Sequence, residues 1–408
     1  MTDATVATEP DAAIRPDRAG IIAVVPDHQT LDRVRGMLQD LRIGDELQLD
    51  ATFDAALRRM REGAAPRVLL LDLSDSPTPF VVLGNARKIG GDALKIVALG
   101  TVNDVGLYRD LIAAGASDYL VKPVGREAFA ASLKRGGATG SAGGWLGQVV
   151  AFVGSRGGVG TTTTAVACAW LLAEQHDAPT VLLDLNLHFG SVALKLDIEP
   201  GSGLCEALEQ PSRIDALFVD RATVKITDRL RVLAAEAPVD ETLIVDAGAL
   251  DALLYELHRK FAWVVVDLPR WVTPAHRIVL GVTNRVAILC ERSLDGLRDT
   301  IRLQAFLREY APQSQVMLID SGAAAERAGI GRSEFEKAVG KKFDVTLSHD
   351  VKAAAAAANA GQPVPVAVPR SSLARDTGRL AASLHGSGAR QKRKIFGMTI
   401  PYYRHATP

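Results

Sequence analysis

The chain has 408 residues, of which 48% are hydrophobic, so it is long enough for two or three domains that each bury a core. Lys+Arg and Asp+Glu both number 47, and this balance argues against a protein dominated by attraction to nucleic acid. The apolar runs are shorter than the roughly 20 residues that span a bilayer, and the polar N-terminus is unlike a signal peptide. We therefore expect a cytoplasmic protein that touches a membrane, if at all, only peripherally.

The three cysteines lie far apart, and each lies in or beside an apolar segment. They are Cys168, Cys205 and Cys290. Their spacing does not fit a metal site, and the pattern predicts reduced, buried thiols.

The N-terminal third of the chain predicts one α/β unit. Residues 1–19 lack apolar periodicity and are expected to be disordered. Between residues 20 and 135, short apolar runs alternate with stretches of helical spacing, which predicts a parallel sheet covered by helices. The apolar runs are Ile21–Val25, Val68–Leu71, Ile96–Leu99 and Tyr119–Val121.

A Gly/Ser-rich segment, 136–147, predicts a flexible linker. A second α/β unit is expected over 148–385, followed by a basic and aromatic tail over 386–408. The expected strands of the second unit are Val149–Val153, Thr180–Asp184, Arg231–Ala234, Trp263–Asp267, Val286–Cys290, Val316–Ile319 and Val345–Leu347. The fold class is therefore α/β, with two doubly wound parallel-sheet domains.

A glycine-rich loop, GSRGGVGTT over residues 154–162, follows the first strand of the second unit and precedes a helix. Glycines let the backbone N–H groups turn toward a phosphate, and the N-terminus of the helix adds partial positive charge. This context predicts a nucleotide-phosphate site. The residues expected to contact the nucleotide here are Gly154, Gly157, Gly158, Val159, Gly160, Thr161, Thr162 and Thr163.

Two strand-end aspartates complete the expected site. Thr162 offers a hydroxyl for Mg²⁺, and Asp267 closes the apolar run that begins at Trp263, where an NTPase holds its metal. Asp184 closes a second such run. A single strand-end aspartate is usually a helix cap, but two of them downstream of this loop favour a site that binds ATP and Mg²⁺.

These motifs resemble the MinD/ParA family of deviant Walker A ATPases, and within it most closely the TadZ/CpaE subgroup and actinobacterial septum-site-determining proteins. The family loop Lys-Gly-Gly-x-Gly-Lys-Thr-Thr corresponds to RGGVGTTT over 156–163. Its switch I corresponds to DLNLHFG over 184–190, and its Walker B motif to VDLP over 266–269. The run ERSLDGLRD over 291–299 resembles the subgroup at that place. Asp350, with Asn359, Gly361 and Pro363, matches a late loop on the nucleotide side, and the resemblance covers roughly 148–385.

Three departures from the family pattern concern the chemistry. Thr161 replaces the loop lysine that would neutralise the β- and γ-phosphates, and Arg156 replaces the signature lysine that reaches across a dimer. Asn186 replaces the second switch I aspartate, and an amide is a poor general base. We name Arg156, Asp184 and Asn186 as the candidate catalytic residues and expect nucleotide binding with weak or absent hydrolysis.

The N-terminal unit resembles a response-regulator receiver domain. Asp72 closes its third strand at the phosphoacceptor position, and Lys122 with Pro123 matches the receiver lysine-proline pair. The acidic pair after the first strand is reduced to Asp27, and Gly100 stands at the position of the hydroxyl residue. We expect a pseudo-receiver used for protein contacts rather than a phosphorylated switch.

The C-terminal tail carries four basic residues before six apolar or aromatic ones within 390–403. Lys394–Gly397 is similar to the amphipathic membrane helix that ends MinD relatives, although a glycine and a proline limit helix length. Weak membrane contact, a solvated tail and a docking peptide all stay open.

The resemblance implies a homodimeric spatial organiser. Its expected role is to place Tad-type pilus or secretion machinery, or the division septum, by binding a polar or septal scaffold or a secretion ATPase. The alternatives are an ATP-hydrolysing, membrane-cycling MinD-like switch and a ParA-like protein that positions DNA. The second alternative requires a basic face, and Arg259, Lys260, Arg270, Arg277 and Arg285 are spread as on an ordinary solvated surface. Nucleic acid is therefore not an expected partner.

Overall fold

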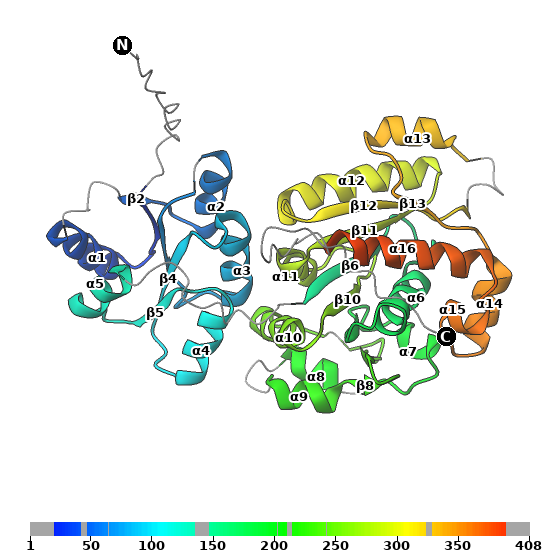
Figure 1. Ribbon diagram of the computed structural model, residues 1–408, viewed down its shortest axis with the longest axis horizontal. Helices are drawn as coiled ribbons and strands as arrows, with labels where there is room; N and C mark the ends of the chain where they lie inside the picture. Colours follow the sequence, from blue (N-terminus) through cyan, green and yellow to red (C-terminus); the bar gives the residue numbers. More distant parts are fainter. Residues whose placement is uncertain are drawn as a thin grey trace, which may run out of the picture. The chain divides into compact units, whose positions relative to one another are not determined.

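The computed structural model describes residues 20–41, 47–63, 65–134, 147–201, 203–209, 214–241, 243–323 and 329–388. Residues 1–19, which are expected to be disordered, lie outside these ranges. Nearly all of the linker and the tail segment 390–403, for which membrane contact is one expectation, lie outside them as well. The chain divides into two compact units between Gly143 and Gly144, and each unit is described separately (Figure 1).

The first unit is a five-stranded parallel sheet with helices on both faces (Figure 1). Its strands are β1 (Ile21–Val24), β2 (Leu47–Leu49), β3 (Val68–Asp72), β4 (Lys95–Gly100) and β5 (Asp118–Val121). Its helices are α1 (His28–Asp40), α2 (Phe53–Glu62), α3 (Pro79–Gly90), α4 (Val105–Ala113) and α5 (Arg126–Lys134). The strand order β2-β1-β3-β4-β5 is the flavodoxin-like order of doubly wound folds, whose sites lie at the carboxyl ends of the strands.

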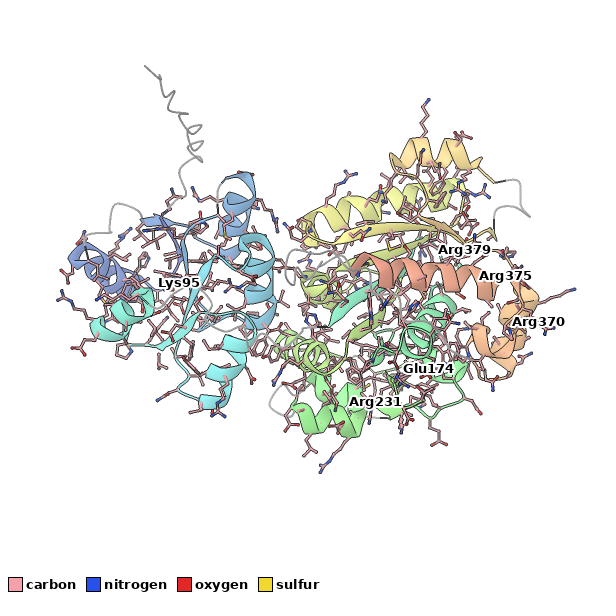
Figure 2. All side chains as sticks on the ribbon, viewed as in Figure 1. Lys95, Glu174, Arg231, Arg370, Arg375 and Arg379 are labelled. Atoms are coloured by element: carbon pink, nitrogen blue, oxygen red, sulfur yellow. The ribbon has the colours of Figure 1, made fainter. Side chains whose placement is uncertain are left out.

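Helices α1 and α5 pack on one face of this sheet, where Val34, Leu38 and Phe129 join the strand residues in one buried cluster. Lys95 fastens the start of β4 to this layer, because its buried ammonium donates to the Leu133 carbonyl at 2.8 Å (Figure 2). The sheet is therefore held to α5 by a polar contact as well as by apolar packing.

The second unit contains an eight-stranded sheet (Figure 1). Its strands are β6 (Gln148–Gly154), β7 (Thr180–Asp184), β8 (Val224–Lys225), β9 (Leu230–Leu233), β10 (Trp263–Asp267), β11 (Arg285–Cys290), β12 (Gln315–Asp320) and β13 (Val345–Thr346). Its helices are α6 (Thr161–Glu174), α7 (Val192–Lys195), α8 (Gly203–Glu209), α9 (Ala216–Ala222), α10 (Ala247–Lys260), α11 (Pro274–Val282), α12 (Leu294–Tyr310), α13 (Arg332–Val339), α14 (Val351–Asn359), α15 (Val364–Ala367) and α16 (Ser372–Gly388).

The strand order β13-β12-β11-β6-β10-β7-β9-β8 places β6 in the middle of the sheet, between β11 and β10. Alternate strand residues face two separate cores. Val149, Val264 and Val266 face a core shared with α8, α10, α11, α12 and α13. Val150 and Val265 face a core shared with α6, α7, α14 and α16. Both faces are therefore covered, as expected for a doubly wound sheet whose strands are continuously apolar.

The α/β fold class expected from the sequence is confirmed, with two differences at sheet edges. β2 and β8 were not expected, and β8 pairs antiparallel with β9. Both strands are very short, and β2 has two exposed residues out of three, so neither produces a buried apolar run that sequence patterning could detect.

Candidate functional site

The loop between β6 and α6 forms the floor of the site. Gly158 and Gly160 have φ angles of +79° and +88°, a left-handed conformation that favours glycine. Gly154 is required for space, since a Cβ there would lie 2.5 Å from the Thr161 hydroxyl. The Thr164 N–H donates to the Gly160 carbonyl at 2.9 Å, so the N–H groups of the three residues before it are left for an anion.

Thr162 and Asp267, the expected metal ligands, lie together. The Thr162 hydroxyl donates to the Asp267 carboxylate at 2.6 Å. Strand register places Asp267 directly beside Asp184 on the neighbouring strand β7, at the carboxyl end of the sheet. Among the described residues no group of three or more His, Cys, Asp or Glu side chains could hold a metal, which is compatible with Mg²⁺ because this ion is usually held by one or two carboxylates plus substrate phosphates.

The two carboxyl groups bind protons unusually tightly. Burial and, to a smaller extent, the neighbouring Asp184 carboxylate together raise the pKa of Asp267 to about 8, while the hydrogen bond from the Thr162 hydroxyl opposes the shift. Burial likewise raises the pKa of Asp184 to about 6, against three backbone N–H groups that favour its ionised form. A cation held here would remove the cost of ionising the pair.

Asp184, a candidate catalytic residue, is occupied in holding the turn that follows β7. Its carboxylate accepts from Asn186 N at 3.0 Å and from Val192 N at 3.2 Å. Gly190 lies so close that a Cβ there would be 2.5 Å from the same carboxylate. Asp184 therefore shapes the turn and is not among the residues that line the cavity described below.

A cavity of about 460 Å³ lies over the glycine loop. The expected residues that line it are Gly154, Arg156, Gly157, Gly158, Gly160, Thr161, Thr162, Thr163, Asn186 and Asp267. Sequence reasoning missed four lining residues with polar or aromatic side chains, namely Ser191, Lys195, Arg270 and Trp271. Val159, also expected at the site, is buried and does not line this cavity.

The Asn186 side chain offers a test of whether the cavity fits a metal and its water. Its Oδ1 atom is buried and has no hydrogen-bond partner within the described parts of the chain. An unsatisfied buried acceptor is costly, and a metal-bound water would satisfy it. The oxygen atoms of Thr162, Asp267 and Asn186 therefore fit Mg²⁺.

Arg156 and Asp350 have intrachain partners. The Arg156 guanidinium lies 3.5 Å from the Asp295 carboxylate, in the first turn of α12. Asp350 caps α14 by accepting from Ala353 N at 3.0 Å and receives the Ser372 hydroxyl at 3.2 Å. The structure thus brings Arg156 to the cavity but does not place Asp350 among its lining residues.

The first unit brings Asp27, Asp72 and Lys122 together. The Lys122 ammonium lies 2.5 Å from the Asp72 carboxylate and 3.8 Å from that of Asp27. Asp27 also caps α1, and its hydrogen bond with Thr30 lowers its pKa. Gly100 has no room for a side chain, since a Cβ would lie 2.3 Å from the Tyr119 hydroxyl oxygen.

Two further predictions can be compared with the structure. Cys168 and Cys290 are buried, Cys205 is half-buried, and all three are free thiols. Burial raises the pKa of Cys168 and Cys290, which keeps these thiols protonated and unreactive. In the part of the chain that the structure describes, no helix is both long and apolar enough to cross a membrane.

Comparison with known proteins agrees with this geometry. Residues 147–321 match the family described as cellulose biosynthesis protein BcsQ. The chain is 29% identical to the uncharacterized protein Rv3660c of Mycobacterium tuberculosis over 195 residues. The matched segment is 47% of this chain and 53% of the relative. The chain therefore spans about half the length of the curated relatives it matches.

Two solved structures share the fold of the second unit. The ParA family ATPase of Chlorobium tepidum is 23% identical, with a TM-score of 0.53 over 57% of this chain and 98% of that one. The septum site-determining protein MinD of Pyrococcus horikoshii, complexed with Mg-ADP, is 13% identical. Its TM-score is 0.51, and the match covers 61% of this chain and 100% of that one.

A glycine loop between a central strand and a helix, with a strand-end aspartate bonded to the helix threonine, defines the second unit as a P-loop NTPase fold. The second unit therefore shares its fold with the ParA family ATPase and with MinD, and its residues 147–321 are similar to the family described as cellulose biosynthesis protein BcsQ.

Proposed function

We propose that the second unit binds ATP with Mg²⁺ and hydrolyses it slowly or not at all, so that it acts as a nucleotide-dependent spatial organiser. The hydrogen bond between Thr162 and Asp267 at the cavity over the glycine loop is the observation that carries the proposal. Bound Mg²⁺ would supply charge neutralisation for the phosphates. The loop N–H groups would position the phosphates, and the Thr162 and Asp267 oxygens would hold the ion.

Four features support slow turnover. Thr161 brings no charge to the phosphates, and Asn186 is a poor general base. Arg156 lies against Asp295 in its own chain, so reaching another nucleotide would require breaking this ion pair. Asp184 is enclosed by the turn it stabilises, which leaves no ionised carboxylate aimed at an attacking water from this position.

Calorimetric titration and an ATPase assay test this function. We expect the full chain to bind Mg-ATP, Asp267→Ala to weaken binding at least about tenfold through loss of the metal ligand, and turnover to stay well below the roughly 1 s⁻¹ of ordinary enzymes. Asp240→Ala, at an exposed position of the same unit, is the matched control. Absence of binding would refute the proposal, and fast turnover that Asp267→Ala abolishes would favour the hydrolysing switch.

The proposed assembly is a homodimer that closes over the cavity. Trp271 lines the cavity yet is 54% exposed, and Leu294, next to the partner of Arg156, is 77% exposed. Large exposed apolar side chains around a site mark an interface. Sizing of the full chain in Mg-ATP and in Mg-ADP tests this assembly.

The proposed cellular role is the positioning of Tad-type pilus or secretion machinery or of the septum, at the inner face of the membrane. The matching family is described as a cellulose biosynthesis protein, and the MinD of Pyrococcus horikoshii is a septum site-determining protein. This MinD is complexed with Mg-ADP, which supports a nucleotide-dependent role for this chain.

The arginines and the lysine that a DNA-positioning role would use are engaged in contacts within the unit. Arg259 pairs with Glu256, Lys260 with Asp220 and Arg270 with Asp299. Arg277 lies over the Tyr310 ring, and Arg285 over the Trp263 ring. These contacts favour a protein or nucleotide partner over DNA.

For the first unit we propose a pseudo-receiver that binds a protein partner. Lys122 forms a close ion pair with Asp72, and the space for a hydroxyl residue at Gly100 is filled by Tyr119. With Asp27 as the other acid of the cluster, the metal ligands that phosphoryl transfer requires are reduced.

Incubation with a small-molecule phosphodonor and Mg²⁺ is expected to leave Asp72 unmodified, because neither the acids for the metal nor a hydroxyl donor for the phosphoryl oxygens is complete. Intact-mass spectrometry of the wild type and of Asp72→Asn should give no phosphoryl adduct in either protein. An adduct on the wild type that Asp72→Asn lacks would establish a working phosphoacceptor instead.

A further inference from the structure

Three cationic side chains line the cavity over the glycine loop, and they differ in their partners. Arg156 pairs with Asp295 at 3.5 Å, and Arg270 pairs with Asp299 at 3.1 Å. Lys195 lines the same cavity, and no carboxylate of the described residues forms an ion pair with it. Among the described residues that line the cavity, Lys195 is therefore the cation without a carboxylate partner.

The fold holds Lys195 in place through a short, well-anchored segment. Lys195 ends α7, and its N–H donates to the Ser191 carbonyl at 3.0 Å. The Asp184 carboxylate fixes the start of α7 by accepting from Val192 N. Val192 and Ala193 are buried in the core shared with α6, the helix that follows the glycine loop. The position of Lys195 is thus fixed by the end of β7, through Asp184, and by packing against α6.

The electrostatics of Lys195 favour an anion beside it. The side chain is half-buried, and burial lowers the pKa of its ammonium, while attraction to Asp267 acts in the opposite direction. An ammonium that has lost much of its water without gaining a close carboxylate is stabilised when a phosphate approaches.

We propose that Lys195 contacts the terminal phosphates of the bound nucleotide and supplies the charge that the loop lost at Thr161. Position 161 opens α6 and position 195 ends α7, and both residues line one cavity with Thr162 and Asp267. The charge required by the phosphates therefore reaches the site from the neighbouring element instead of from the loop itself. This inference rests on the nucleotide binding proposed above.

Binding titrations on the full chain with Mg-ATP and with pyrophosphate test Lys195. Lys195→Gln is expected to weaken both ligands about 10- to 100-fold, the size of a lost charge-assisted hydrogen bond. Lys195→Arg should retain most of the affinity, and Lys337→Gln, an exposed lysine of α13, should retain all of it. Retention by the arginine variant separates loss of charge from loss of fold.

A double-mutant cycle gives a readout that a purely structural role would not change. If Lys195 replaces the loop lysine, Lys195→Gln should cost less than about threefold once Thr161→Lys is present, since one charge can then stand in for the other. An equal loss in both backgrounds would show that the two positions act independently and would overturn the proposal.

The outcomes also distinguish this proposal from the proposed function. Wild-type binding of Mg-ATP that Lys195→Gln leaves unchanged would overturn the role of Lys195 and leave nucleotide binding intact. Pyrophosphate binding that depends on Lys195, without any Mg-ATP binding, would support the phosphate contact and refute the nucleotide function. Binding of neither ligand by the wild type would overturn both.

Discussion

In the Lys195→Gln background, Thr161→Lys is expected to tighten the binding of Mg-ATP by about 10- to 100-fold, because a lysine there would restore a charge-assisted hydrogen bond of about 1.5–3 kcal/mol to the phosphates. Thr161 already lines the cavity, so a longer side chain at this position can extend into its volume of about 460 Å³. Turnover should stay slow, since Asn186 still lacks the basicity to activate water. Calorimetric titration measures the first effect, and phosphate release measures the second.

Thr161→Gln serves as the control for Thr161→Lys, because it adds length and hydrogen-bonding capacity without charge. In the same Lys195→Gln background, the parent protein and Thr161→Gln should bind Mg-ATP within about threefold of each other, well inside the effect of a charged group. A lysine variant that binds no better than the glutamine variant would show that the cavity does not receive the nucleotide phosphates in the expected way.

Asp267→Asn is expected to raise the stability of the nucleotide-free protein at alkaline pH while removing its response to Mg-ATP. The folded-state pKa of Asp267 is raised, so the folded protein holds this proton more tightly than the unfolded chain does. The contribution of the Asp267 carboxyl group to the free energy of unfolding is fully present below about pH 4. This contribution is lost as the pH rises toward about 8. The asparagine variant escapes this loss, since it does not ionise.

Thermal unfolding of the full chain between pH 5 and pH 9 measures the difference. The variant should gain several degrees on the wild type at the alkaline end, at about 2–4 °C per kcal/mol for a domain of this size. Added Mg-ATP should raise the unfolding temperature of the wild type alone, through preferential binding to the folded state. Asp240→Asn, at an exposed site, should follow the wild type, and parallel pH curves for all three proteins would contradict the prediction.

Much of the nucleotide site could be predicted because its signals are local in the sequence. The glycine loop, Thr162 and Asp267 each adjoin a strongly apolar strand, so their place at one edge of a parallel sheet follows from strand order alone. The same reasoning assigned Asp184 to the site, and the strand register pairs this residue with Asp267. Sequence reasoning could not reveal that the Asp184 carboxylate accepts hydrogen bonds from the backbone of its own turn, because these bonds depend on how residues 186–192 fold back.

Lys195 and Asp350 show which features of the site depend on the fold rather than on a sequence motif. Lys195 lies in a four-residue helix that produces no periodic pattern, and only packing against α6 brings it to the loop. Asp350 matches a family motif, yet here its carboxylate caps α14. A capping aspartate and a ligand-binding aspartate have the same sequence signature, so only the fold distinguishes them.

The short helix α7 joins the interior of the nucleotide site to the outer surface of the unit. Leu194, 77% exposed, directly precedes Lys195, which lines the cavity, and Phe189 in the same turn is 62% exposed. The Asp184 carboxylate accepts from the backbone N–H groups of Asn186 and Val192, so it fixes both ends of this turn to the end of β7. A partner that binds Leu194 would therefore contact the short helix that carries Lys195, so its binding surface would adjoin the nucleotide cavity without including it.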